Sequence, residues 1–308
     1  MSAQFVETYL DSPTGAKLKL YSRMPEGRVR AAVQINHGMA EHAARYARFA
    51  EALADAGFAA YAHDHRGHGQ TTAPDASPGV FGGKGLDNVV ADLMAVNRHI
   101  RARAEIPVIV FGHSMGSVIA LNFALRHSDR LAALACWNAG VETGILARVA
   151  RVIMVNERML RGRDRPSRIA PALTFTSWNR DFRPNRTDFD WLSRDEAEVD
   201  KYVADPLCGF DVSTGLWQDV LSGIFFAADQ RKFGRLGGEM PVHLVGGGVD
   251  PCTNGGNDMR HLARRFERAG MQDVTLKVLP ETRHESLNEI NRDETTAQFI
   301  EWLSARFP

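Results

Sequence analysis

The pentapeptide Gly112-His113-Ser114-Met115-Gly116 has the pattern Gly-x-Ser-x-Gly. The apolar run Ile106 to Phe111 precedes it, and a helical run from Val118 to Leu125 follows it. A serine on a sharp turn between strand and helix is strained, and the strain lifts its hydroxyl clear of the sheet. Glycine on both sides leaves room for the two elements to approach. We therefore expect Ser114 to act as a nucleophile; the alternative is a tight glycine-rich turn with an incidental serine.

A serine nucleophile needs a base to take its proton and an acid to orient that base. Asp250 comes after the apolar run Val242 to Gly246, and His284 comes after Val274 to Leu279. The carboxyl ends of parallel strands meet at one edge of a sheet, so we expect Ser114, Asp250 and His284 to converge there. Taken alone, Asp250 could be a turn former and His284 a surface or core histidine.

The same chemistry needs two backbone donors for an oxyanion. Met115, the residue after the serine, is expected to supply one N–H group. Met39 is expected to supply the other, because Gly38 follows the run Arg30 to Asn36 and permits a bend that aims the Met39 N–H inward. The alternative is a turn that only caps the next helix.

The elements that must position these residues alternate between β-branched or aromatic runs and amphipathic stretches. This alternation predicts an α/β fold with a mostly parallel sheet covered on both faces. The expected strands are residues 5–10, 17–21, 30–36, 58–62, 106–111, 131–137, 242–246 and 274–279, the first two forming an antiparallel hairpin at the sheet edge. The expected helices are 42–56, 86–104, 118–125 and 258–269.

The alternation stops between residues 142 and 239, a stretch dense in arginine and aromatic side chains. It is too long for an ordinary loop, so it must hold structure of its own. We expect a core formed by residues 1–141 and 240–308, with a helical cap formed by residues 142–239.

Seven arginines lie between residues 146 and 168, against Glu157 and Asp164 as the only acidic residues there. Apolar residues alternate with them: Leu146, Val149, Val152, Ile153 and Met159. A basic amphipathic helix of this kind can rest on an anionic membrane surface. The alternative is a solvated cap face over an apolar stripe that packs on the core.

Composition limits the classes of partner. The 308 residues carry 37 basic and 37 acidic side chains, and this balance disfavours a nucleic-acid binder. Cys136, Cys208 and Cys252 are too few and too scattered for a disulfide framework, which favours a reducing compartment. We see no signal peptide and no apolar run of the roughly 18 residues that span a bilayer. We therefore expect a cytoplasmic protein with a small-molecule partner; its oligomeric state is not indicated.

The run His63-x-His65-x-x-His68 with Asp64 begins like a metallo-hydrolase motif. Gly67 stands where such a motif requires an acidic ligand. We expect a packed loop beneath the site, with Asp64 and Arg66 bonding locally, and no metal or other cofactor.

Four segments together resemble the α/β-hydrolase family of monoacylglycerol lipases and lysophospholipases: His37-Gly38-Met39-Ala40-Glu41-His42, His63-Asp64-His65-Arg66-Gly67-His68-Gly69, Gly112-His113-Ser114-Met115-Gly116 and His284-Glu285-Ser286-Leu287-Asn288-Glu289. The resemblance implies an eight-stranded sheet with a lid after the sixth strand. It also implies a Ser114–Asp250–His284 triad, oxyanion donors at Met39 and Met115, and hydrolysis of monoacylglycerol or lysophospholipid esters. Two segments of the insertion, 179–187 and 189–195, resemble a bacterial branch of the family.

Other functions use the same framework. A catalytically silent scaffold would keep the fold and bind a ligand without turnover. A thioesterase, a peptidase or an acyltransferase would use the same triad. A dehalogenase-type enzyme would need a carboxylate nucleophile, and position 114 is serine.

Overall fold

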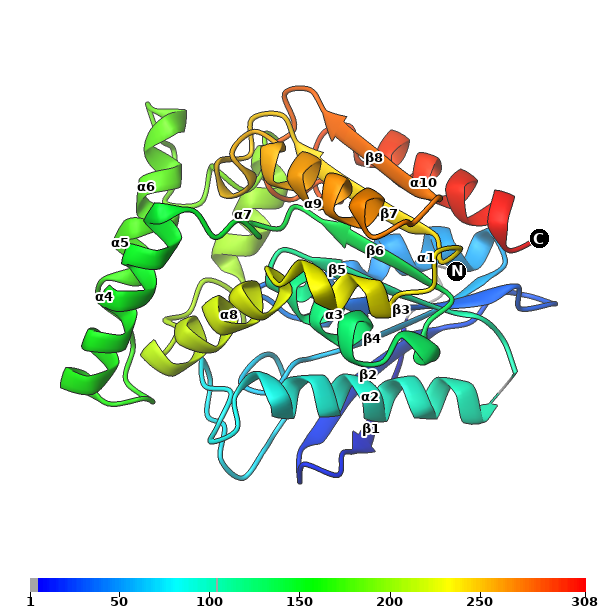
Figure 1. Cartoon of the computed structure of the whole chain (residues 1–308), viewed down its shortest axis with the longest axis horizontal. Coiled ribbons are helices and arrows are strands. Elements are labelled where there is room, and N and C mark those ends of the chain that lie inside the picture. The colour runs from blue at the N-terminus through cyan, green and yellow to red at the C-terminus, as the bar shows by residue number, and fades with distance from the viewer. Residues whose placement is uncertain (1–4, 104) are drawn as a thin grey trace.

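Eight strands form one sheet in the computed structural model, which describes residues 5–103 and 105–308 (Figure 1). The spatial order is β1-β2-β4-β3-β5-β6-β7-β8. The first hairpin and the β2–β4 pair are antiparallel, and every other pair is parallel. The expected α/β-hydrolase architecture, with its mostly parallel eight-stranded sheet, is confirmed.

Each expected strand is present within a few residues of its predicted bounds. The strands are β1 Val6–Asp11, β2 Lys17–Arg23, β3 Ala31–Asn36, β4 Phe58–His63, β5 Val108–His113, β6 Ala133–Trp137, β7 Val242–Gly247 and β8 Val274–Leu279. The five strands β3 to β7 are buried along their whole length. Helices cover both of their faces, which explains why apolar side chains predominate on both faces and why polar ones such as Gln34 and His243 are buried as well.

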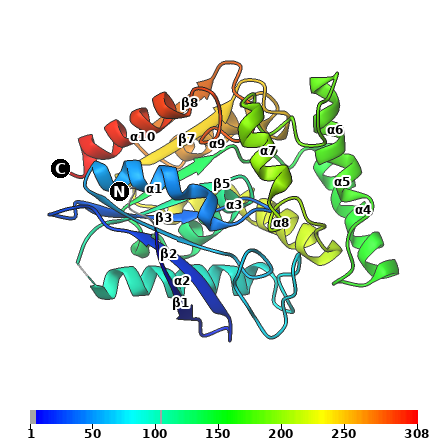
Figure 2. The same cartoon turned by 180° about the vertical axis from the view of Figure 1, so that it is seen from behind.

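Helices form a layer on each face of the sheet (Figures 1 and 2). Phe49, from α1, and Phe299 and Trp302, from α10, join one apolar cluster with the inner strands. Apolar residues of α2, α3, α8 and α9 form a larger cluster on the opposite face. The bounds of these helices are α1 Ala47–Asp55, α2 Leu86–Arg103, α3 Met115–Arg126, α8 Thr214–Ala227, α9 Asn257–Arg268 and α10 Arg292–Arg306.

Two features differ from the expectation. The helix expected over residues 42–56 begins as a 3-10 turn, Ala43–Tyr46, before α1 starts at Ala47. Helix α10 was not predicted, although Phe299 and Leu303 fill the space under β5 and β6. Residue 104, at the expected end of the second helix, lies outside the described residues.

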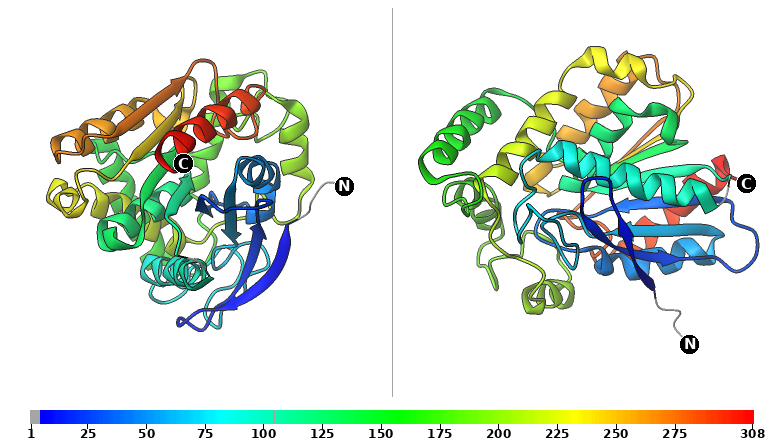
Figure 3. Two further views of the ribbon diagram at one scale, coloured as in Figure 1. Left: turned by 90° about the vertical axis from the view of Figure 1, so that its right-hand side faces the viewer. Right: turned by 90° about the horizontal axis from the view of Figure 1, so that it is seen from below.

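The insertion after β6 is helical and lies beyond the carboxyl ends of the parallel strands (Figures 1 and 3). Besides α8 it contains α4 Ile145–Arg161, α5 Ala170–Leu173, α6 Phe175–Asn179 and α7 Glu196–Ala204. Its last helix, α8, packs along α3, and Leu216, Trp217 and Val220 belong to the same apolar cluster as Val118. We propose that residues 142–239 are a cap anchored to the core through α8.

His63, the last residue of β4, is fully buried in this fold. Neither nitrogen of its ring has a hydrogen-bond partner among the described residues. Burial lowers the pKa of His63 from 6.5 to about 4, and the negative charge of Asp92 opposes this only weakly. His63 is therefore neutral in the folded protein at neutral pH.

Protonation of His63 is expected to destabilise the fold in acid. The unfolded chain binds this proton near pH 6.5 and the folded chain only near pH 4, so stability falls as the pH drops through that window. His63→Leu keeps the site apolar and removes the titration. Between pH 7 and pH 5, the wild-type protein should lose about 1 to 2 kcal/mol more unfolding free energy than the variant in urea titrations. Equal losses would contradict the assignment.

Candidate active site

Ser114 sits on a strained turn between β5 and α3. Its backbone has φ 54° and ψ −121°, a strained conformation with positive φ that costs a residue other than glycine about 1 to 3 kcal/mol. A Cβ on Gly112 would lie 2.2 Å from the Gly116 carbonyl oxygen, and one on Gly116 would lie 2.0 Å from the Asn36 carbonyl oxygen. Both glycines are therefore required by backbone contacts, as the sequence pattern predicts.

The structure brings Ser114, His284 and Asp250 together at the carboxyl ends of the strands. The Ser114 Oγ lies 2.9 Å from His284 Nε2, and His284 Nδ1 lies 3.1 Å from both oxygens of Asp250. Because an ionised carboxylate only accepts hydrogen bonds, Nδ1 carries the ring proton. Nε2 is then the acceptor for the serine hydroxyl, which is the arrangement needed for proton transfer.

The carboxylate of Asp250 is fully buried, and several groups donate hydrogen bonds to it. Asn138 Nδ2 donates to it at 3.2 Å, Thr253 Oγ1 at 3.0 Å and the Cys252 N–H at 2.9 Å. Burial acts to raise the pKa of Asp250, but the charge and hydrogen bond of His284, together with Asn138 and Thr253, outweigh it and lower the pKa. The carboxylate thus stays ionised and orients the imidazole.

Met39 and Met115 flank the serine on two sides. Met115 is the first residue of α3, and Met39 lies with Gly38 in the wall of the small cavity at Ser114. Within residues 5–103 and 105–308, neither backbone N–H donates to another protein group. Ala40, the next residue, is left-handed with φ 54°, so the loop is strained beside the expected donor.

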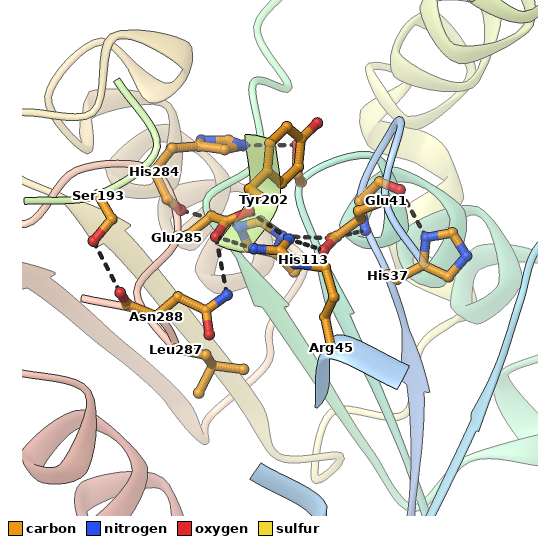
Figure 4. Close-up of polar contacts among 12 residues, drawn as sticks. His37, Glu41, Arg45, His113, Ser193, Tyr202, His284, Glu285, Leu287 and Asn288 are labelled. Carbon is orange, nitrogen blue, oxygen red and sulfur yellow. Dashed lines mark hydrogen bonds and ion pairs between the residues drawn. The ribbon is translucent and has the colours of Figure 1, made fainter. Parts of the chain in front are cut away.

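A buried ionic cluster joins the Met39 loop to the His284 loop (Figure 4). Glu41 Oε1 accepts the Gly38 N–H at 2.5 Å, and the other oxygen of Glu41 pairs with Arg45. Arg45 also binds Glu285 with two hydrogen bonds of 2.7 Å. Arg45 therefore bridges two carboxylates, one in each loop, and this fixes the distance between the loops.

His113, the residue before the nucleophile, connects to the same cluster. Its Nε2 donates to the His284 carbonyl at 3.0 Å, and its Nδ1 lies 3.5 Å from Glu41 Oε1 (Figure 4). Burial acts to lower the pKa of His113, but the hydrogen bond and charge of Glu41 overcome this and raise it. The backbone of the proposed base is thus held by a histidine that binds a carboxylate.

Two cavities lie near the serine. The first, about 30 Å³, touches Ser114, His284, Trp191 and Leu192. The second, about 410 Å³, extends under the cap and is lined by Phe175, Phe189, Tyr202, Phe210 and Trp217 together with Arg180, Arg183, Asp188 and Asp211. Phe175, Phe189 and Tyr202 line both, so these three side chains separate the serine from the larger space.

Possible metal ligands do not form a convincing site. Among the described residues, one set places three ligand atoms within 4.8 Å of each other: His42, Asp205 and Cys208. His42 Nε2 already pairs with Asp205 at 2.8 Å, and burial raises the pKa of the Cys208 thiol, so the thiolate that a metal requires is disfavoured. The expected motif residues His63 and His65 instead pack ring to ring, with centroids 4.8 Å apart.

Asp64 and Arg66 bond locally, in the manner expected of a packed loop. Asp64 accepts the N–H groups of Ala43 and Gln70, each at 2.8 Å. Arg66 is fully buried and donates to Asp92 at 2.8 Å. The loop thus braces the segment that follows Met39.

Sequence reasoning missed the residues that support the triad from other elements. Asn138 has a signal that could have found it, because it directly follows β6 at the same sheet edge. Glu41 and Arg45 have the i, i+4 spacing of an ion pair, but Glu285 lies 240 residues further along the chain. Nothing in the local sequence links such distant partners.

Replacement of Gly116 by alanine is expected to disrupt the turn. Its Cβ would meet backbone atoms of Asn36 and His37 that cannot rotate away. We expect Gly116→Ala to lose about 2 to 4 kcal/mol of unfolding free energy and nearly all labelling by a fluorophosphonate. Gly234→Ala is the matched control, since an added Cβ there meets nothing within 4 Å. A stable, fully labelled Gly116→Ala protein would refute the close approach.

Comparisons with known proteins identify the family of the chain. Residues 27–291 match the family model described as "Serine aminopeptidase, S33". The chain is 28% identical to the monoglyceride lipase of Rattus norvegicus over 87% of this chain and 83% of that protein. It is 27% identical to the monoacylglycerol lipase of Mycolicibacterium smegmatis over 91% of this chain and 90% of that protein.

The fold is also that of solved relatives. A thermostable carboxyl esterase from Bacillus coagulans superimposes with a TM-score of 0.89 at 24% identity, over 99% of this chain and 100% of that one. At this identity the likeness concerns the fold alone. The family match covers most of the chain, and the chain therefore belongs to the serine aminopeptidase S33 family of α/β-fold serine hydrolases.

Proposed function

We propose that the protein hydrolyses carboxylic esters of acyl lipids, monoacylglycerols or lysophospholipids, through an acyl-enzyme. The observation that carries the proposal is the relay from Ser114 Oγ through His284 to Asp250, with contacts of 2.9 Å and 3.1 Å. The named relatives, which are monoacylglycerol lipases, support the substrate class. No cofactor enters the proposed reaction.

In the proposed mechanism His284 takes the proton of Ser114 as the serine oxygen attacks the ester carbonyl carbon. Asp250 holds the ring tautomer and stabilises the imidazolium. The N–H groups of Met39 and Met115 bind the oxyanion of the tetrahedral intermediate. His284 then gives its proton to the departing alcohol oxygen. Water, activated by the same histidine, attacks the acyl-serine and releases the carboxylic acid.

The lining of the small cavity favours an ester over a peptide. An aminopeptidase must bind a substrate ammonium group, which calls for a free carboxylate beside the serine. The carboxylates in the wall of the small cavity are Glu41 and Glu285, and Arg45 pairs with both. The other lining carboxylates, Asp188 and Asp211, belong to the larger cavity. The larger cavity has aromatic walls and charged residues, which suit an acyl chain with a polar end.

The space at Ser114 is narrow in this conformation. Its cavity measures about 30 Å³, against about 410 Å³ for the larger cavity. A substrate that enters from the larger cavity must displace Phe175 or Phe189, because Tyr202 is held by its hydrogen bond to the Ala40 carbonyl. These two phenylalanines therefore control access to the nucleophile.

The cap presents an unusual surface. Helix α4 exposes Ile145 (81% exposed), Met159 (79%) and Leu160 (87%), together with Val149 and Val152, and the exposed Arg148 and Arg151 lie among them. Glu157 is buried and accepts from Ser167, so its charge faces inward. We propose that this face of α4 rests on an anionic lipid surface, from which the enzyme draws its substrate.

None of the helices in the described residues is long and apolar enough to cross a membrane. Cys136, Cys208 and Cys252 are free thiols. Free thiols are typical of a reducing compartment, so we propose that the enzyme acts in the cytoplasm.

Ser114→Ala is expected to lower kcat for short p-nitrophenyl esters by at least about 10⁴-fold and to abolish fluorophosphonate labelling. Ser128→Ala, whose hydroxyl bonds to the Arg235 carbonyl on the surface, is the matched control and should behave like the wild type. Retention of labelling in Ser114→Ala would place the nucleophile elsewhere.

Unlabelled wild-type enzyme, from a batch whose active fraction has been titrated with the fluorophosphonate, should then be offered acylglycerols, lysophospholipids, acyl thioesters and aminoacyl anilides of graded length. Highest kcat/KM for the two lipid esters is expected. Labelling without turnover of any of them would favour a silent scaffold, and preference for thioesters would favour a thioesterase.

The lipid-surface proposal predicts binding to vesicles that contain phosphatidylserine, with weaker binding as the ionic strength rises. Val152→Asp combined with Met159→Asp should weaken binding at least about tenfold in cosedimentation, because it places charge on the exposed apolar face. Ile290→Asp, at a position 60% exposed and outside residues 142–239, is the control. Equal wild-type partitioning at low and high salt would refute the proposal.

A further inference from the structure

The loop that carries Met39 also contacts the cap. We propose that Tyr202 of α7 is a positioning residue for the oxyanion site, because its hydroxyl holds the Ala40 carbonyl and thereby fixes the adjacent Met39 N–H. The proposal rests on the proposed function, since it assigns Tyr202 a part in the same reaction. It means that the cap helps to build the catalytic site as well as to cover it.

The first argument is backbone strain at Ala40. Its φ of 54° lies in the left-handed region, which an alanine does not favour. The loop therefore needs outside contacts to keep this shape. Two hydrogen bonds reach the Ala40 carbonyl, and both come from the cap: the Tyr202 hydroxyl donates at 2.9 Å and the Gly209 N–H at 2.9 Å.

The second argument is that the Tyr202 hydroxyl is itself fixed. It lies 3.2 Å from the Gly209 N–H, which donates to it, so its own proton is directed to Ala40. Tyr202 is buried, and its ring contacts Arg45, at 4.9 Å from the ring centre, and Phe189, at 5.0 Å. A buried side chain with these contacts cannot turn away from the loop without moving its neighbours.

The third argument is how the loop is supported along its length. At its start, the core residue Glu41 accepts the Gly38 N–H at 2.5 Å. At its end, the cap residue Asp205 pairs with His42 at 2.8 Å. Met39 lies between a core contact on one side and cap contacts on the other. Its N–H direction therefore depends on both, and a displaced cap would misalign it.

Tyr202→Phe tests the role because it removes the hydroxyl and keeps the ring. Tyr61→Phe is the matched control, since the Tyr61 hydroxyl contacts Met24 Sδ on the far side of the sheet. With p-nitrophenyl butyrate, we expect kcat of Tyr202→Phe to fall about 5- to 30-fold with KM within about twofold. Fluorophosphonate titration corrects each rate for the fraction of active enzyme.

The inhibition constant of a trifluoromethyl ketone separates a role at the oxyanion site from a merely structural role, which would leave this constant unchanged. The ketone adds to the serine to give a tetrahedral oxyanion, so its affinity reports the oxyanion donors. We expect its inhibition constant to rise in Tyr202→Phe by the same factor as kcat/KM falls, and to stay unchanged in Tyr61→Phe.

Three outcomes would overturn the role of Tyr202. These are unchanged kcat, a rise in KM alone, or a loss confined to the active fraction with normal turnover per titrated site. If the wild-type enzyme labels with the fluorophosphonate but hydrolyses no ester, the proposed function fails and the role of Tyr202 fails with it. Wild-type turnover with unaltered Tyr202→Phe constants overturns the role of Tyr202 alone.

Discussion

The whole site depends on one steric constraint, the close approach of three backbone segments around Ser114. The end of β3, the end of β5 and the first turn of α3 meet where a single Cβ on Gly116 would lie 2.0 Å from the Asn36 carbonyl. This contact exposes the serine hydroxyl, places the Met115 N–H at a helix start, and brings the loop after β3 beside it. Backbone contacts thus set the nucleophile and the expected Met115 donor, whereas the direction of the Met39 N–H also depends on the side chains of Glu41 and Tyr202.

Charged side chains then connect the loops whose positions the backbone sets. Arg45 between Glu41 and Glu285 is a buried ion cluster, and burial makes such groups costly unless each charge is paired. Burial acts to raise the pKa of Glu41, but the charges of Arg45 and His113 hold it well below its usual value, so the carboxylate stays ionised. A cluster of this kind adds little stability in general. Its contribution here is geometric, because it ties the loop of the proposed oxyanion donor to the loop of the proposed base.

Much of the fold could be predicted because its signals are local. Each inner strand is a short apolar run, and Gly112 and Gly116 flank Ser114 at a spacing that only a sharp turn requires. The triad residues could be proposed because each follows a strand. Arg45 and Tyr202 could not, because their importance lies in contacts with Glu285 and Ala40, which are distant in the chain. Asn138 was missed although it directly follows β6 at the same edge of the sheet. The outward orientation of the apolar face of α4 could not be predicted either. The periodicity of the sequence shows that the helix has an apolar face but not whether this face points to the core or to solvent.

The packing of α8 on α3 determines which residues of the cap can be deleted. Gly223 of α8 lies so near the core that an added Cβ would come within 2.6 Å of Leu86 and 3.1 Å of Val118. The last cap helix is therefore a wall of the main hydrophobic interior rather than a removable cover. A shortened chain in which a brief linker replaces residues 142–239 would remove that wall, with Leu216, Trp217 and Val220, and expose core residues such as Val118, whereas excision that spares α8 keeps this wall in place.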